Sequence, residues 1–406
     1  MYVPAGKLKT WLALVTPEGL LLLATVLALR LEAVQDALPS FARFYPYAVF
    51  IVGALLAWRF QRSRLLFALI VLALASSGLQ LRGGGGAAGR VAFAATALLL
   101  PLNLAGLALL ADRGTLTPFG LLRLGAIAAQ VIGVDLLRRT APAATASVLS
   151  HALLPAKLFT WSPVSQPALL AFLVAVVITA LPLVFEPNAT GRGFLWAIVA
   201  SFLAVSARRP GALGPVYLGT AGLILVVAVI EASYLLAYQD GLTQLPARRA
   251  LTEAMQRLAG QYAVAMVDVD HFKKFNDEYG HDVGDQVLRM VASKLAQVQG
   301  GGRAYRYGGE EFAIIFPGKE VEETLPHLEA VREEVAEAAF TIRRRIRRRR
   351  AESEKGSRRR RIQVSITVSI GVAAKNTRHA NPDQVIRAAD QALYLAKEAG
   401  RNRLRS

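Results

Sequence analysis

The feature that most constrains this chain is the contrast between its two parts. Residues 1–239 carry 17 basic and 7 acidic residues, whereas residues 240–406 carry 30 basic and 22 acidic residues. The first part consists of apolar runs separated by short polar or glycine- and proline-rich breaks. A soluble helical bundle would need a polar face that this composition does not supply. We therefore predict an all-α transmembrane domain over residues 1–239 and a soluble domain over residues 240–406.

A helix that crosses a bilayer needs about 20 predominantly apolar residues. The N-terminal domain holds eight candidate spans, of which the second and the seventh are short, so we predict seven to eight transmembrane helices. A cleaved signal peptide suits the first segment less well, because Pro17 and Glu18 interrupt it and further spans follow. The candidate spans are residues 11–31, 45–60, 65–80, 91–111, 119–137, 168–186, 194–207 and 216–238.

The flanking charges do not decide the orientation of these spans. Lys7, Lys9 and the Arg59–Arg64 cluster favour a cytoplasmic N-terminus, but Arg138 and the other basic residues near the far helix ends would then face outward, against the positive-inside rule. Within the last span, Glu231 is either a sensing residue or a side chain that reaches the interface. The chain contains no cysteine, which excludes disulfides, thiolate-bound metals and a cysteine nucleophile.

Acidic residues cluster at two predicted strand ends of the soluble domain. The apolar run 262–267 predicts a buried strand, and Asp268-Val269-Asp270 follows it directly. Gly308-Gly309 separates two strand-like runs, as expected for a hairpin turn, and Glu310-Glu311 comes immediately after it. Hard divalent cations prefer such oxygen ligands. We favour a metal site at this corner, with a solvated strand end and exposed turn glutamates as the alternative.

Two further pairs of residues suit a purine nucleotide. Asn276 offers a donor and an acceptor, and Asp285 offers paired acceptors, which together match the edge of guanine. Lys397 and Arg401 lie four residues apart near the end of a helix predicted over residues 383–399, where they can clamp phosphates. The alternative for these two is a basic helix end that complements the helix dipole.

A strongly basic segment, Arg343–Arg361, carries a net charge of +10, against −2 for the rest of the soluble domain. Alternating apolar residues after it predict a strand over residues 362–370. We predict an extended hairpin with residues 351–357 as its loop, in contact with anionic lipid at about 1 kcal/mol for each basic residue. A solvated arm is the alternative. Nucleic acid is not an expected partner, because no aromatic residue is interleaved for stacking.

Six motifs in the expected order give the soluble domain a family resemblance. Residues 240–406 resemble the GGDEF-type diguanylate cyclase domain, with the signature in its GGEEF form. The resemblance implies an α/β (α+β) fold of the nucleotide-cyclase type, with a central, mainly antiparallel sheet flanked by helices. It does not extend to the transmembrane bundle. The motifs are residues 240–249, 268–277, 280–285, 306–312, 369–373 and 392–402.

The resemblance also implies roles for the residues singled out above. Asp268 and Glu311 would ligate Mg²⁺, with Mn²⁺ as an alternative, and Val269 would add its carbonyl oxygen. Glu310 would complete the metal site or help to deprotonate the attacking 3′-hydroxyl. The remaining residues would hold GTP: Asn276 and Asp285 at the guanine, Gly308 and Gly309 beside the triphosphate, and Lys397 and Arg401 at the β and γ phosphates.

The implied reaction joins two GTP molecules into cyclic di-GMP and releases two pyrophosphates. Each domain would bind one GTP, so a homodimer is expected, with the membrane domain controlling its geometry. The implied location is the bacterial inner membrane, multi-pass, with the GGDEF domain in the cytoplasm. The alternative is a catalytically silent GTP-binding or scaffolding domain on a membrane receptor.

The sequence departs from the family pattern at two places. Ala247 replaces the usual asparagine before two arginines, which removes a local hydrogen bond but no catalytic group. Residues 299–302 lack both charges of the R-x-x-D inhibitory site, so no product inhibition is expected there. The last span also meets Asp240 with almost no linker, so any signal would pass directly from helix to cyclase.

Overall fold

The structure, a computed structural model, describes residues 17–81, 85–152, 154–155, 159, 162–207, 213–258, 260–338, 340–343 and 361–406. The chain divides into two compact units, residues 1–233 and 234–406. The division falls inside one continuous helix, α10 (Leu213–Tyr238), which ends two residues before Asp240.

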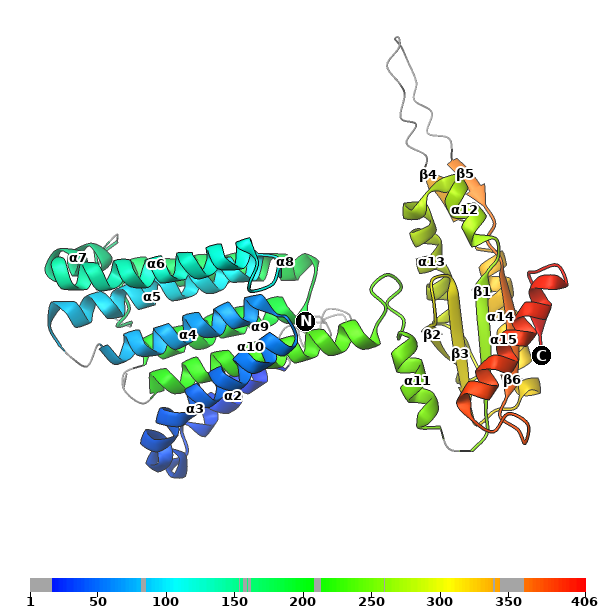
Figure 1. The fold of residues 1–406 in the computed structure, drawn as a ribbon, viewed down its shortest axis with the longest axis horizontal. Helices are drawn as coiled ribbons and strands as arrows, with labels where there is room; N and C mark the ends of the chain where they lie inside the picture. Colours follow the sequence, from blue (N-terminus) through cyan, green and yellow to red (C-terminus); the bar gives the residue numbers. More distant parts are fainter. Residues whose placement is uncertain are drawn as a thin grey trace, which may run out of the picture. The chain divides into compact units, whose positions relative to one another are not determined.

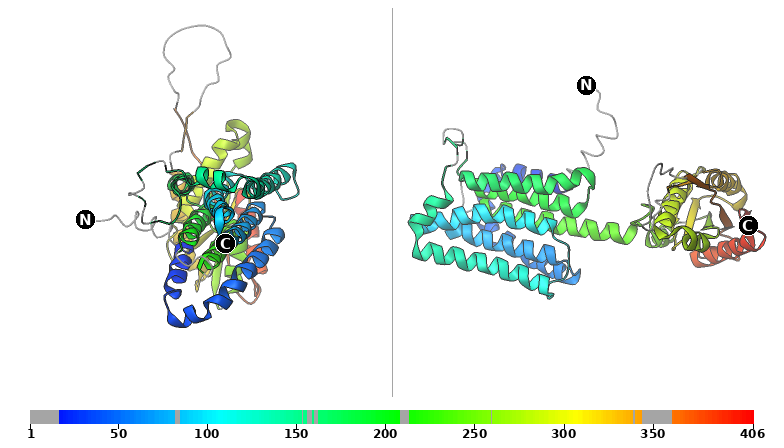
Figure 2. Two further views of the ribbon diagram at one scale, coloured as in Figure 1. Left: turned by 90° about the vertical axis from the view of Figure 1, so that its left-hand side faces the viewer. Right: turned by 90° about the horizontal axis from the view of Figure 1, so that it is seen from above.

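The N-terminal unit is a bundle of helices that run side by side (Figures 1 and 2). Seven helices in the described part of the chain are long and apolar enough to cross a membrane, which confirms an apolar, helical N-terminal region. These helices are Ser40–Arg59 within α3 (Glu32–Arg59), α4 (Ser63–Leu81), α5 (Gly86–Leu109), α6 (Pro118–Thr140), α8 (Gln166–Phe185), α9 (Ala189–Ser206) and α10; α7 (Pro142–Leu149) is shorter.

The first predicted span does not form a helix of membrane length within the described residues. Of the segment 11–31, residues from 17 onward are described, and they form α2 (Glu18–Ala28), an apolar helix of 11 residues. At 1.5 Å per residue α2 is about 16 Å long, roughly half the thickness of the hydrocarbon core. The second and seventh predicted spans, in contrast, belong to helices long enough to cross. The described chain therefore holds seven helices that are long and apolar enough to cross a membrane, within the predicted range of seven to eight.

Three charged groups within the bundle form one cluster. Arg192 of α9 binds Glu231 of α10, with 2.6 Å between Nη2 and Oε1, and its Nε lies 3.5 Å from a carboxylate oxygen of Glu18. Glu231, predicted to be either a sensing residue or one that reaches the interface, is thus an ion-pair partner. Because charges in an apolar environment are costly unless paired, this cluster ties together α2, α9 and α10.

The C-terminal unit is built on a five-stranded sheet with the order β2-β3-β1-β6-β7. Every neighbouring pair is antiparallel except β6 and β7, which confirms the predicted, mainly antiparallel sheet flanked by helices. The strands are β1 (Tyr262–Val269), β2 (Arg303–Arg306), β3 (Glu311–Pro317), β6 (Val368–Ala374) and β7 (Leu404–Arg405), and the helices are α11 (Arg248–Gln256), α12 (Phe272–Tyr279), α13 (His281–Leu295), α14 (Val321–Ala336) and α15 (Pro382–Glu398).

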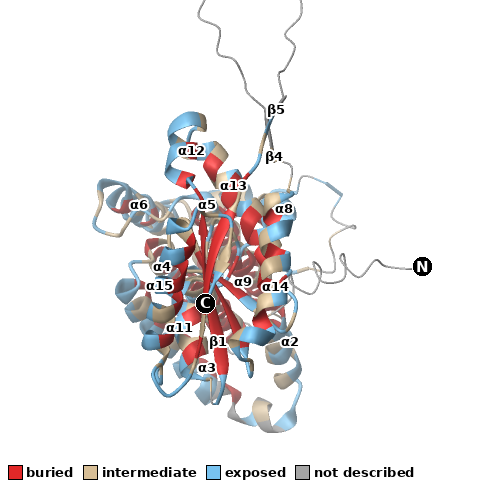
Figure 3. Ribbon diagram, turned by 90° about the vertical axis from the view of Figure 1, so that its right-hand side faces the viewer, coloured by how far each residue is buried: buried red, intermediate tan, exposed pale blue. Residues whose placement is uncertain are grey.

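The central strand β1 is buried along its whole length (Figure 3). Ala265 and Val267 contribute to a core that α13 and α14 complete. Val264 and Met266 contribute to a second core, which α11 and α15 complete. Side chains alternate between the two faces of a strand, so a strand covered on both sides reads as the continuous apolar run seen in the sequence.

The alternating run 362–370 is not one strand, contrary to the prediction. β5 (Arg361–Val364) pairs antiparallel with β4 (Phe340–Arg343) in a separate sheet, whereas β6 joins the main sheet beside β1. Val364, Ile366 and Val368 all pack into the same core. The apolar alternation therefore continues although the hydrogen-bonding partner changes. Residues 344–360, which include most of the basic segment and its predicted loop, lie outside the described residues.

Gly371 of β6 allows α15 to lie against the sheet. A β-carbon at this position would collide with the backbone nitrogen of Leu393 and the carbonyl oxygen of Ala389. Backbone atoms cannot rotate away as a side chain can, so any side chain here would push α15 outward. Lys397, in the last turn of the same helix, would move with it.

We expect Gly371→Ala to destabilise the packing of α15 by about 1–3 kcal/mol, the usual cost of an overfilled core. Hydrogen exchange of the α15 amides in the full-length protein measures this loss as faster exchange. Gly241→Ala is the matched control, because a β-carbon there meets nothing within 4 Å. Equal protection of α15 in both variants would contradict the close packing.

Candidate active site

The predicted acidic corner lies at the ends of two paired strands. Asp268 of β1 stands directly opposite Glu311, the first residue of β3, in the antiparallel register. The N–H of Val269 donates to the carbonyl oxygen of Glu310 at 3.3 Å. Strand pairing therefore brings these residues together, although two helices and a strand separate them along the chain.

The Asp268 carboxylate is buried, with 5% of the residue exposed, and it is paired with a lysine. Lys397 of α15 places its Nζ 2.9 Å from Oδ1 of Asp268. A buried carboxylate without a compensating charge is costly, so this pair stabilises the end of β1. Lys397, predicted as a phosphate clamp, is thus also the partner of a predicted metal ligand.

The corner carries an excess of negative charge. Burial raises the pKa of the Asp268 carboxyl above its ordinary value, although the neighbouring Lys397 opposes the shift. Burial also raises the pKa of Glu310, and the charges of Asp268 and Glu311 add to this increase. Three carboxyl groups share the ammonium of Lys397 and the more distant charge of Arg401, so the corner favours either a proton or a further cation.

The available donors have the chemistry of a hard divalent cation site. The carboxylates of Asp268, Glu310 and Glu311 and the carbonyl of Val269 are oxygen ligands of the kind that Mg²⁺ takes. In the described residues, however, no three His, Asp or Glu side chains already converge on one point. Lys397 supplies the positive charge beside Asp268 instead. Cation binding therefore requires the side chains to rearrange, above all the release of Asp268 from Lys397.

Asp270, the second carboxylate after β1, has a structural role. Its carboxylate accepts hydrogen bonds from the hydroxyls of Thr367 and Ser369, both at 2.7 Å, and from the backbone N–H of Asn402 at 3.0 Å. These contacts hold the ends of β1 and β6 and the segment before β7 together. Asp270 is therefore engaged by hydrogen-bond donors of the protein itself.

The turn before Glu310 is the predicted hairpin between β2 and β3. The N–H groups of Tyr307 and Gly308 both donate to the carbonyl oxygen of Glu311, at 2.9 and 3.1 Å. A β-carbon on Gly308 would lie 2.6 Å from a carboxylate oxygen of Glu311. Glycine at this position therefore leaves room for the Glu311 side chain, while Gly309 is exposed.

An arginine that the sequence analysis did not assign to the site holds this turn in place. Arg306 donates from Nε to the carbonyl of Gly308 at 3.1 Å, from Nη2 to that of Gly309 at 2.8 Å, and from Nη1 to Asp240 at 2.6 Å. Burial pushes the pKa of Asp240 upward, but hydrogen bonds from Arg306 and Thr243 hold it below its ordinary value. Each of the two residues is the first of a family motif, residues 240–249 and 306–312, and this position in the motifs was the sequence evidence that both belong to the site.

Asp240 also begins the turn that leads into α11. Ala247, at the N-cap of that helix, makes no side-chain capping hydrogen bond, as expected from the loss of the usual asparagine. The N–H of Arg306 donates to the carbonyl of Pro246 at 2.9 Å. Arg306 thus joins the first motif of the domain to its signature turn through both side chain and backbone.

The predicted guanine-binding residues lie on two consecutive helices, Asn276 on α12 and Asp285 on α13. The Oδ1 atom of Asn276 is buried and has no hydrogen-bond partner. A β-carbon on Gly284 would collide with this oxygen, so the glycine leaves space for it. Leaving a buried acceptor unsatisfied costs about 1–3 kcal/mol. A ligand that donates a hydrogen bond there would recover this energy.

Arg401 follows α15 with a left-handed backbone (φ 61°), and its N–H donates to the carbonyl of Ala396 at 3.1 Å. Its guanidinium lies close enough to Asp268 to lower the pKa of that carboxyl electrostatically. Lys397 and Arg401 therefore both interact electrostatically with Asp268. Their role is thus more than that of a basic helix end that complements the helix dipole.

Comparisons with known proteins identify the C-terminal unit by its sequence. The family described as "Diguanylate cyclase, GGDEF domain" matches residues 237–403. Diguanylate cyclase VdcA from Vibrio cholerae is 39% identical over 169 residues, which cover 41% of this chain and 45% of VdcA. Diguanylate cyclase DgcP from Pseudomonas aeruginosa is 36% identical over 176 residues, covering 41% of this chain and 24% of DgcP. Response regulator PleD from Caulobacter vibrioides is 34% identical over 181 residues, which cover 43% of this chain and 37% of PleD.

The matched region spans less than half the length of each of these relatives. Among solved structures, the coiled coil and GGDEF domain of DgcB from Caulobacter crescentus, in complex with c-di-GMP, is 34% identical and covers 46% of this chain and 94% of that one, with a TM-score of 0.39. The sequence matches, the motif order and the acidic corner agree on one assignment: residues 237–403 of this chain are a GGDEF domain, of the family to which diguanylate cyclases belong.

Proposed function

We propose that the chain is a membrane-bound diguanylate cyclase, which condenses two GTP molecules into cyclic di-GMP and two pyrophosphates. Named diguanylate cyclases are similar to it over the GGDEF domain. The observation that carries the proposal is the acidic corner, where Asp268 is opposite Glu311 and beside Glu310. Carboxylates on neighbouring strands can supply the ligands of a metal ion that assists phosphoryl chemistry.

Mg²⁺ is the cofactor that this corner suits, with Mn²⁺ as an alternative. Asp268, Glu311 and the Val269 carbonyl would hold the cation, which when bound neutralises charge on the phosphates. Lys397 would then be released from Asp268 and, with Arg401, would neutralise the β and γ phosphates of GTP. The ion pair at 2.9 Å supports such an exchange, because it shows that Lys397 reaches the acidic corner.

Glu310 is suited to accept the proton of the attacking 3′-hydroxyl. Its pKa is raised by burial and by the neighbouring Asp268 and Glu311, and a base works best when its pKa approaches the working pH. In the reaction, a bond forms between the 3′-oxygen and the α-phosphorus. The bond from that phosphorus to the leaving pyrophosphate breaks, and the proton passes to Glu310.

The guanine would be held by Asn276 and Asp285. Oδ1 of Asn276 has no hydrogen-bond partner within the described part of the protein, and a turn of the side chain away from Gly284 would present it to the base. Gly308 and Gly309 would let the turn lie close to the triphosphate. Each domain holds one GTP in this scheme, so two domains must face each other, and the active form is a homodimer.

The N-terminal region would anchor the enzyme in the bacterial inner membrane. We assign residues 1–239 to the transmembrane domain and residues 240–406 to the cyclase, which must be cytoplasmic to meet GTP. The seven apolar helices support this placement. The basic segment Arg343–Arg361 would contact anionic lipid at the same face. Since α10 ends two residues before Asp240, the membrane domain could control the dimer directly.

The alternative function is a silent GTP-binding or scaffolding domain. The pairing of Lys397 with Asp268 favours it, because a permanent ion pair would block a metal ligand. The intact set of Asp268, Glu310, Glu311 and Lys397 favours the enzyme. An activity assay separates the two functions.

We expect the full-length protein to form cyclic di-GMP from GTP and Mg²⁺, and Asp268→Asn to lower the rate at least about a hundredfold, because a metal contributes several kcal/mol to the transition state. Chromatography of the products measures both rates. Glu337→Gln, at an exposed glutamate after α14, should keep full activity. GTP binding without product formation by the wild-type protein would support the silent alternative.

The pKa shifts predict how Mg²⁺ binding depends on pH. Asp268 and Glu310 hold protons to a higher pH than ordinary carboxyls. Without metal, their contribution to stability is present at low pH and is lost as the pH rises through the raised pKa values. Metal ligation requires the deprotonated forms. Stabilisation by Mg²⁺ should therefore grow over this same range.

Thermal unfolding of the full-length protein, with and without Mg²⁺ at a series of pH values, measures this effect. Asp268→Asn should lose most of the pH dependence, because only Glu310 then titrates at the corner. A stabilisation by Mg²⁺ that is the same at every pH would contradict competition between the cation and protons.

Product inhibition through residues 299–302 is not expected, because this stretch is Gln-Gly-Gly-Gly and carries no charge. Excess cyclic di-GMP should leave the initial rate of GTP turnover unchanged, as should cyclic di-AMP, the matched control. Potent inhibition by cyclic di-GMP alone, lost when Gln299 is replaced by Ala, would overturn this prediction.

A further inference from the structure

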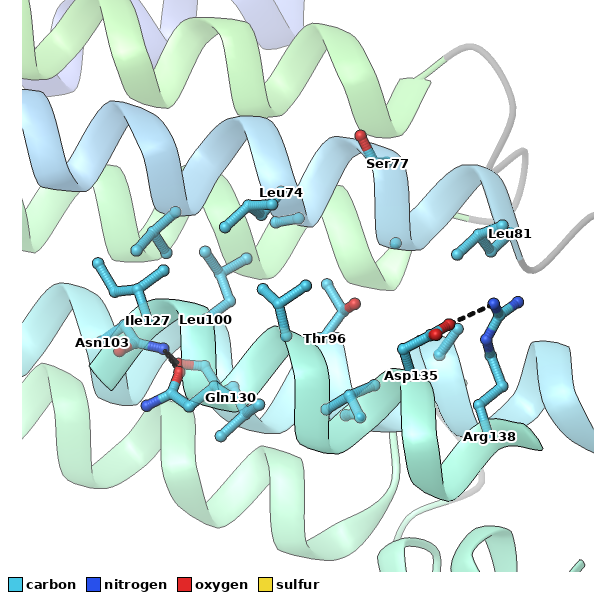
Figure 4. Close-up of a pocket in the computed structure, with 18 residues that line it drawn as sticks. Leu74, Ser77, Leu81, Thr96, Leu100, Asn103, Ile127, Gln130, Asp135 and Arg138 are labelled. Carbon is cyan, nitrogen blue, oxygen red and sulfur yellow. Dashed lines mark hydrogen bonds and ion pairs between the residues drawn. The ribbon is translucent and has the colours of Figure 1, made fainter. Parts of the chain in front are cut away.

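A cavity of about 210 Å³ lies between α4, α5 and α6 of the N-terminal unit (Figure 4). An apolar cavity of about 150 Å³ is known to hold benzene, so this one has room for a larger molecule. Its walls are mainly apolar side chains, among them Leu74, Leu81, Leu100, Ile127, Val131 and Val134.

The cavity is a long slot that follows the helix axes. Its lining runs from Val71 to Leu81 on α4, from Ala92 to Asn103 on α5 and from Ile127 to Arg138 on α6. Each stretch spans ten or eleven residue steps, or about 15 Å at 1.5 Å per residue. A slot of this length suits one extended alkyl chain.

The two ends of the slot are polar in different ways. At one end Asn103 donates from Nδ2 to Oε1 of Gln130 at 2.7 Å and to the carbonyl of Leu99 at 3.0 Å, so these neutral groups satisfy each other. At the other end Asp135 pairs with Arg138 at 2.6 Å and with Arg139 at 2.7 Å (Figure 4 shows the first pair).

The charged end attracts an anion, because one carboxylate is shared by two guanidinium groups. The neutral end offers no charge to a ligand. Arg138 lies two residues before the end of α6, and α4 ends at Leu81 only five residues before α5 begins. The charged end is therefore at helix termini, where a membrane meets water, and the neutral end is deeper.

Few residues of α6 are buried, namely Gly120 and Ile127. The neighbouring α4 and α5 have many buried side chains. The α6 wall of the slot therefore lies at the outside of the bundle and the other two walls belong to its core.

We propose that this slot binds a single-chain amphiphilic anion, such as a medium-chain carboxylate, with its headgroup at Arg138 and its chain directed toward Asn103 and Gln130. The inference rests on the membrane placement in the proposed function. Alternate crossing of the seven helices puts the Arg138 end on the side opposite the end of α10 that leads into the GGDEF domain. The ligand would therefore enter from outside the cell, which makes the site suitable for sensing.

Equilibrium binding of radiolabelled dodecanoate to the full-length protein in phosphatidylcholine nanodiscs tests the proposal. We expect saturable binding of one molecule per chain, with dodecanol a weaker competitor. Arg138→Gln should weaken dodecanoate binding at least about tenfold, because losing a hydrogen bond to a charged group lowers affinity by about this factor. Dodecanoate should then bind no better than dodecanol. Asp135→Asn should strengthen it, because Arg138 is then freed from its partner.

Two matched pairs of variants separate the site from general effects on the bundle. Val134→Phe fills the slot and should abolish binding, whereas Ile132→Phe, at a residue of α6 that is 66% exposed, should not. Arg123→Gln, at the opposite end of α6, should leave binding unchanged.

Absence of saturable binding by the wild-type protein would overturn the proposal, and so would binding that is unchanged in both Val134→Phe and Arg138→Gln. The assay uses no GTP, so its failure is distinct from a failure of cyclase activity. A protein that makes cyclic di-GMP but binds no dodecanoate would contradict this inference alone. A protein that does not enter the nanodisc would contradict the membrane part of the proposed function.

Discussion

The ion pair between Asp268 and Lys397 connects the fold of the C-terminal unit to its chemistry. It joins the end of the central strand β1 to the last turn of α15, the helix that lies close against β6 at Gly371. A buried carboxylate must be neutralised by a proton, a basic side chain or a metal ion. Lys397 neutralises it in this structure, and the raised pKa of Asp268 and the carboxylates alongside add to the demand for positive charge at this corner. Lys397 therefore occupies the position beside Asp268 at which a cation would have to bind.

The local parts of this site could be predicted from the sequence. The apolar run 262–267 predicted β1, and the glycine pair predicted the turn between β2 and β3. The order of the motifs predicted that Asp268 lies near Glu310 and Glu311. Contacts made by side chains over long distances could not be predicted in this way. Asp270 looks like a second metal ligand, yet its partners Thr367, Ser369 and Asn402 come from remote segments.

The prediction of a single strand from periodicity failed for a physical reason. The run 362–370 alternates because its apolar side chains share one core, but its backbone passes from one sheet to another, which periodicity does not record. In the first apolar segment, the part that the structure describes contributes the 11-residue helix α2. Arg306 was overlooked for a different reason: its importance lies in the three acceptors it reaches in the folded turn.

The most direct measurement is an experimental structure of the full-length protein with Mg²⁺ and a non-hydrolysable GTP analogue. The account predicts that Lys397 leaves Asp268 and contacts the phosphates, that a cation lies between Asp268 and Glu311, and that Oδ1 of Asn276 accepts a hydrogen bond from guanine. A nucleotide bound with the Asp268–Lys397 pair intact and no cation at the corner would contradict it.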